Sequence, residues 1–61
     1  MNIYYDAEGV CLCDGDRVYK HDENGHRQYG TFNYVDLIVE WDNNYLPDED
    51  VSENTKILYL A

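Results

Sequence analysis

Four side chains in the first half of the chain belong to the residue types that bind transition metals. Cys11 and Cys13 offer two thiols, and His21 and His26 offer two imidazoles, a set that zinc accepts. Paired zinc ligands usually come from a Cys-x₂₋₄-Cys motif, however, and the Cys-x-Cys spacing here is tighter. The two histidines flank an Asn-Gly turn, where both rings can face solvent. We therefore predict no metal site and no cofactor, with the thiols in the core and the histidines exposed at the turn.

The spacing of the two cysteines also bears on the cellular compartment in which the protein is expected to reside. In an extended chain Cys11 and Cys13 point to the same side, and such neighbours on one strand fit disulfide geometry poorly. Free thiols are typical of a reducing cytosol. The residues at the N-terminus are too polar for a secretory or membrane-spanning segment. We expect a cytoplasmic protein that does not enter a membrane.

The acidic turns raise the question of a calcium site or of catalytic carboxylates. Asp14, Asp16, Asp22 and Asn24 do not follow the register of an EF-hand loop. Asp and Asn side chains in turns commonly bond their own backbone instead. Thirteen acidic residues make accidental carboxylate pairs unavoidable, and the sequence has no nucleophile motif and no glycine-rich phosphate loop. We predict that the protein is not an enzyme and has no catalytic residues.

Charge is the most distinctive property of the sequence. Thirteen acidic residues against four basic ones give a formal net charge of −9. Direct binding to nucleic acid or to an anionic membrane is therefore excluded, because phosphate contacts need Lys and Arg. A basic protein partner, such as a nucleic-acid-binding protein whose channel the acids block by imitating phosphates, fits this charge. A solvated acidic surface that serves only solubility fits it too. The residues predicted to meet a basic partner are Glu40, Asp42, Asp48, Glu49, Asp50 and Glu53.

The elements that must position these side chains are short strands. In the central stretch, residues 30–42, one face of an extended chain carries Val35, Leu37, Val39 and Trp41, and the other carries Asp36, Ile38, Glu40 and Asp42, as in a half-buried strand. The parity of the apolar residues slips between Asn33 and Asp36, which predicts a bulge or tight turn between two strands. With 61 residues the chain forms one domain, 1–61. The predicted strands are 2–5 and 10–13, which form an N-terminal hairpin, and 17–21, 29–34, 37–42 and 56–60, with a helical turn near 52–55.

Several short motifs between residues 15 and 60 resemble those of Src-homology-3-like small barrels. They are Gly15-Asp16-Arg17-Val18, Tyr29-Gly30-Thr31, Val39-Glu40-Trp41-Asp42, the turn at 52–55 and the strand Ile57-Leu58-Tyr59-Leu60. The resemblance implies an all-β fold, a small barrel or rolled sheet of five to six strands with one helical turn before the last strand. The hairpin at 2–13 is either an addition to that pattern or a replacement for its usual first loop. Such barrels serve many functions, so the fold alone assigns none.

The resemblance also implies an alternative function. In Src-homology-3-like domains, aromatic side chains line a groove for extended peptides or surround a cationic side chain. The matching candidates here are Tyr19, Trp41 and Tyr45, beside Asp42. For Trp41, a plain core position is favoured over a place in such a groove. In size and charge, the chain is similar to small acidic phage proteins that inhibit host nucleic-acid enzymes. We therefore predict a protein-binding module with an acidic surface; a peptide-binding barrel or a subunit of a larger assembly are the alternatives.

Overall fold

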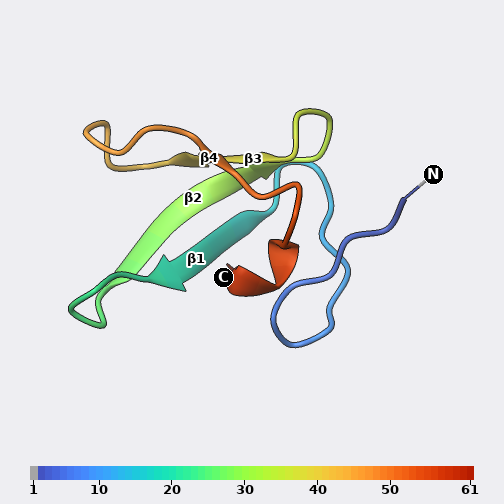
Figure 1. Ribbon diagram of the computed structural model, residues 1–61, viewed down its shortest axis with the longest axis horizontal. Coiled ribbons are helices and arrows are strands. Elements are labelled where there is room, and N and C mark those ends of the chain that lie inside the picture. Colours follow the sequence, from blue (N-terminus) through green and yellow to red (C-terminus); the bar gives the residue numbers. More distant parts are fainter. Residues whose placement is uncertain (1) are drawn as a thin grey trace.

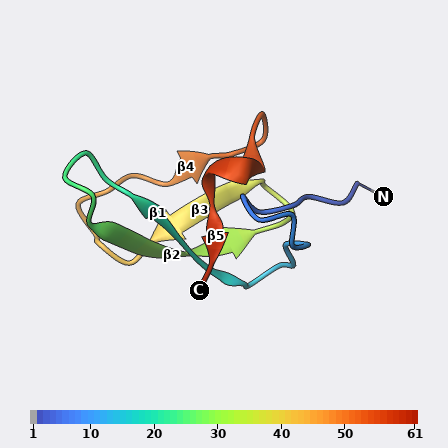
Figure 2. The same cartoon turned by 90° about the horizontal axis from the view of Figure 1, so that it is seen from below.

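The computed structural model describes residues 2–61, which form one antiparallel sheet of five short strands in the order β4-β3-β2-β1-β5 (Figure 1). The strands are β1 (Arg17–His21), β2 (Arg27–Asn33), β3 (Ile38–Trp41), β4 (Glu49–Asp50) and β5 (Tyr59–Leu60). β4 and β5 are the two edges, so the sheet is not closed. It is curled, with β5 running steeply across the direction of β2 (Figure 2). The structure confirms the predicted all-β class.

The only helical element of residues 2–61 is the 3₁₀ turn η1 (Thr55–Ile57), and no helix in this part of the chain could cross a membrane. The turn begins later than the predicted 52–55, because Asn54 and not Ser52 caps it by accepting the N–H of Lys56 at 3.0 Å. Ser52 is otherwise engaged: its N–H donates to the carboxylate of Asp50 at 2.8 Å. Both contacts are local turns made by a side-chain oxygen and a nearby backbone donor.

The register separates the strand residues into two faces. Val18 lies opposite Gly30, and Gly30 lies opposite Trp41, so this row faces inward. Phe32 opposite Val39 forms the next inward row. Directly opposed residues of antiparallel strands share a face of the sheet. The side chains of the outward rows are therefore a different set from those of the inward rows. The buried core consists of Leu12, Val18, Phe32, Val39, Trp41, Val51 and Leu58. Trp41 is 8% exposed, which confirms its predicted place in the core.

The predicted break in the central stretch is a turn over residues 34–37, between β2 and β3. Leu37 ends the turn with a φ of 53°, in the left-handed region, which is energetically unfavourable for a residue with a Cβ. Val35 is exposed, contrary to its predicted place on the apolar face, because it lies in this turn and not in a strand. Gly30 lies inside β2, where the absence of a side chain lets β3 approach closely. A Cβ there would lie 2.7 Å from Val39 Cγ1 and 2.8 Å from the Glu40 carbonyl oxygen.

The N-terminal segment is held to the end of the chain by a buried carboxylate. Asp6 is only 1% exposed, and its Oδ1 accepts the N–H groups of Glu8 and Val10 at 2.9 and 2.8 Å. Its Oδ2 accepts the N–H of Leu60 in β5 at 3.2 Å. These bonds curl residues 6–10 into a loop, so the predicted hairpin is reduced to one bridge between Tyr5 and Cys11. Asp6 therefore links the two ends of the described chain.

Candidate functional site

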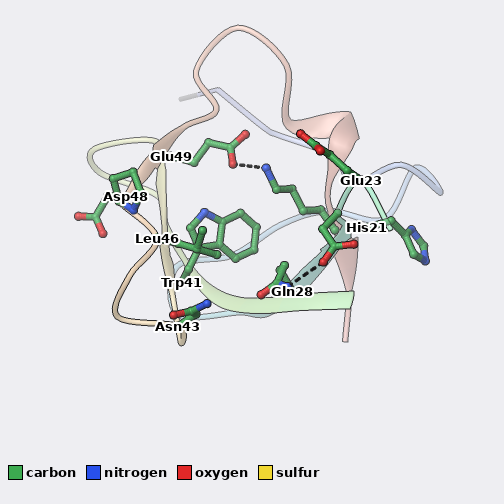
Figure 3. Close-up of a pocket in the computed structure, with 11 residues that line it drawn as sticks. His21, Glu23, Gln28, Trp41, Asn43, Leu46, Asp48 and Glu49 are labelled. Carbon is green, nitrogen blue, oxygen red and sulfur yellow. Dashed lines mark hydrogen bonds and ion pairs between the residues drawn. The ribbon is translucent and has the colours of Figure 1, made fainter. Parts of the chain in front are cut away.

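An open pocket of about 470 Å³ lies beside the inward face of the sheet, at the ends of β1 and β3 (Figure 3). Trp41, Leu46 and Pro47 supply its apolar part. Four carboxylates border it, and Lys20 is the one ammonium group among its lining residues. The four acids are Asp22 and Glu23, from the turn after β1, and Asp48 and Glu49, from the start of β4 and the residue before it.

Lys20 crosses the pocket from β1 to the opposite wall. Its Nζ lies 5.2 Å from the centroid of the Trp41 ring and donates to Glu49 Oε1 at 2.5 Å. The side chains of Lys20 and Glu49 are each 31% exposed, so this ion pair is only partly shielded from water. An ammonium group at this distance from an indole ring is attracted by the negative face of the ring. The pocket therefore already holds one cation on an aromatic surface, next to a carboxylate.

The acidic turn on the other wall is held by hydrogen bonds to the carboxylate of Asp22. Asp22 Oδ2 accepts a hydrogen bond from the amide of Gln28 at 3.1 Å, and its Oδ1 accepts the N–H groups of Asn24 and His26 at 2.9 Å each. The bond from Gln28, supported by these N–H groups, lowers the pKa of Asp22, so the carboxylate stays charged in mild acid. Figure 3 shows that the imidazole of His21 points away from the pocket. His21 is nevertheless one of the residues that line the pocket, and Nδ1 of His26 lies 4.0 Å from Oδ2 of Asp22.

The structure divides the six predicted acidic site residues among three places. Asp48 and Glu49 border the pocket described above. Asp50 and Glu53 border a second hollow of about 350 Å³ beyond β4. Glu40 of β3 lies opposite Thr31 of β2 on the outward face of the sheet, and Asp42, two residues further along the chain, lies on the same face. Both carboxylate oxygens of Asp42 accept hydrogen bonds from the guanidinium of Arg17, and this ion pair lowers the pKa of Asp42.

The predicted aromatic groove of Tyr19, Trp41 and Tyr45 is not assembled. Trp41 faces the core, whereas Tyr19 lies on the outward face, and Tyr45 projects into solvent at 96% exposure. Tyr19 instead stacks on Tyr59 with ring centroids 5.2 Å apart, and Arg27 lies 4.3 Å over its ring. Tyr29 and His21 extend this outward cluster, with ring centroids within 6 Å of Tyr19. Its members come from β1, β2 and β5, which the register places side by side.

The cysteines and histidines considered as metal ligands are not brought together. No group of three or more His, Cys, Asp or Glu side chains among residues 2–61 has the arrangement of a metal site. Cys11 and Cys13 are free and exposed, contrary to the predicted core position, because Leu12 between them takes the inward direction. The nearby charge of Cys11, and then of Asp16, raises the pKa of the Cys13 thiol. The Cys13 thiol is therefore protonated at neutral pH.

Sequence reasoning missed three charged side chains of the pocket. Lys20 and Glu23 received no role, and Asp22 was considered only as part of an acidic turn. The signal that could have found Lys20 is parity, since Lys20 shares the inward face with Val18 on the same strand. The contact between β1 and the start of β4 could not be read from spacing, because Lys20 and Glu49 are 29 residues apart.

Comparison with known proteins found no matching family model, no similar characterised protein and no similar solved structure. The function must therefore be inferred from the residues of this chain.

Proposed function

We propose that this protein is a non-enzymatic binding module whose acidic pocket docks on a basic segment of a partner protein. The observation that supports this most is the lining of the pocket: four carboxylates and one ammonium group surround an apolar wall that includes Trp41. Lys20 is already paired with Glu49, so Asp22, Glu23 and Asp48 leave the pocket with negative charge in excess. A partly enclosed site of one sign of charge attracts ligands of the other sign and speeds their association.

In one form of this proposal, the protein binds in the nucleic-acid channel of a basic partner protein. Acidic side chains outside the pocket would extend the contact: Glu40 on the outward face, and Asp50 and Glu53 around the second hollow. Ser52 donates hydrogen bonds to Asp50, lowering the pKa of that carboxyl and keeping it charged. A partner channel that normally holds phosphates would supply the Lys and Arg residues that such carboxylates need.

We also propose that the sheet is an Src-homology-3-like barrel that stays open at its edges. Two features support this. The outer strands β4 and β5 follow one another in sequence and lie at opposite edges of the sheet, and the 3₁₀ turn lies between them. The motif Val39-Glu40-Trp41 also lies in a strand that contributes two core residues, as the resemblance implies.

The experiment titrates the protein with octa-arginine and follows the fluorescence of Trp41, the only tryptophan of the chain. The test variant is Glu23→Gln with Asp48→Asn, and the matched control is Glu8→Gln with Asp36→Asn, which removes the same two charge types away from the pocket. An exposed ion pair contributes about 0.2–1 kcal/mol, so losing two should weaken binding by roughly two- to thirtyfold relative to the control. Added salt should weaken all complexes. Equal affinities for the two variants, or affinity indifferent to salt, would refute the proposal.

The outward aromatic cluster supports a second candidate, a peptide-binding module. Tyr19, Tyr29 and Tyr59 present adjoining rings on one face, with Arg27 over Tyr19, and Tyr29 is 40% exposed. Rings of this kind bind extended peptides through stacking and hydroxyl hydrogen bonds. If Tyr29→Ala abolished partner binding while the variant lacking Glu23 and Asp48 kept it, this candidate would replace the first.

A further inference from the structure

The position of Lys20 shows how a foreign cation can lie in the pocket. Its ammonium group meets the two features that would attract a basic side chain, the face of Trp41 at 5.2 Å and the carboxylate of Glu49. The hydrogen bond that Glu49 accepts from Lys20 is drawn as a dashed line in Figure 3. Lys20 thus fills the contacts that a ligand would use, while belonging to the protein itself.

We propose that Lys20 is an internal substitute for one arginine side chain of the partner, and that binding displaces its ammonium group from Trp41 and Glu49. This inference rests on the proposed function. Arginine is the side chain that gains most here, because its planar guanidinium stacks on an indole ring and can bond a carboxylate with two N–H groups at once. An ammonium group offers neither the flat surface nor the two-pronged bond.

The contacts of Lys20 permit such an exchange. Glu49 is the one side chain among residues 2–61 that accepts a hydrogen bond from its Nζ, and a third of each side chain is exposed. Its stem of four methylene groups can swing without moving the strand. Glu23 and Asp48 border the same pocket and can receive the displaced ammonium group.

The exchange lowers the apparent affinity for a basic ligand. A site that is occupied by its own side chain binds with its intrinsic affinity only in the fraction of molecules in which that side chain has left. Removing the ammonium group of Lys20 should therefore strengthen the binding of an arginine ligand.

The test compares Lys20→Met with Lys56→Met. Both variants lose one positive charge and keep an unbranched side chain, but Lys56 lies exposed in η1, outside the pocket. We expect Lys20→Met to bind octa-arginine about fivefold more tightly than Lys56→Met, because one partly exposed ion pair and one cation–π contact no longer compete. Equal affinities, or weaker binding by Lys20→Met, would overturn the exchange and leave the acidic pocket standing. Absence of octa-arginine binding by every variant would overturn the proposed function and the exchange together.

A measurement on the unaltered protein makes the test independent of how well the variants fold. Protons of the Lys20 side chain that lie over the indole ring experience its ring current, so their NMR resonances are displaced from the usual positions. Saturating octa-arginine should return them toward those positions and shift the indole N–H resonance of Trp41. If the Lys20 resonances stayed in place while Trp41 responded, the ligand would bind beside Lys20 and the proposal would be wrong.

Discussion

The buried carboxylate of Asp6 is expected to control the stability of the whole domain. In Asp6→Asn, the amide oxygen can still accept the N–H groups of Glu8 and Val10, but its NH₂ group then faces the N–H of Leu60 and that bond is lost. A hydrogen bond to a charged group contributes about 1.5–3 kcal/mol and one to a neutral group about 0.5–1.5 kcal/mol. One bond lost and two weakened therefore amount to about 3.5–6 kcal/mol.

That loss is large for so small a domain. Stabilities of about 0.05–0.15 kcal/mol per residue would give this chain roughly 3–9 kcal/mol in total. Asp6→Asn should lower the urea midpoint, measured by the fluorescence of Trp41, and lower Tm by more than about 10 °C. The matched control is Asp48→Asn, which removes the same charge from an exposed side chain. A free energy of unfolding within about 0.5 kcal/mol of the control would refute this account of Asp6.

The same carboxylate predicts a direction for the pH dependence. Burial favours its neutral form, but the N–H groups of Val10, Leu60 and Glu8 outweigh burial and lower the pKa of Asp6. Its contribution is therefore present above the unfolded-state pKa of about 3.9 and is lost as the pH falls through the lower pKa of the folded state. The difference in stability between the unaltered protein and Asp6→Asn should be widest above about pH 5 and should narrow in stronger acid. A difference that grew on acidification would contradict this reasoning.

Two further substitutions test the packing. Gly30→Ala would place a Cβ 2.8 Å from the Glu40 carbonyl oxygen and 2.9 Å from Trp41 Cε3, so it should destabilise the fold by about 1–3 kcal/mol in urea unfolding; an unchanged midpoint would show that β2 and β3 are packed less closely. The double variant Cys11→Ser with Cys13→Ser should unfold within about 0.5 kcal/mol of the unaltered protein, since both thiols are exposed, and a larger loss would place a sulfur in the core.

The sequence by itself determined the all-β class, the break in the central stretch between Asn33 and Asp36, and the burial of Trp41. These features follow from local chemistry. Turn residues interrupt the chain at short intervals, and the alternation from Leu37 to Trp41 assigns each side chain to a face of its own strand. The excess of acid also follows directly, since charge does not depend on the fold.

Only the tertiary structure decided which side chains meet. Lys20 reaches Glu49 because β1 and β4 lie on opposite sides of β2 and β3 in a curled sheet, and sequence spacing carries no such distance. Tyr19 meets Tyr29 and Tyr59 because the register of three strands aligns them, and a slip of one residue would have turned each to the other face. Asp6 could not be recognised as a buried residue from its turn-like neighbours, because its third partner, Leu60, lies at the other end of the chain.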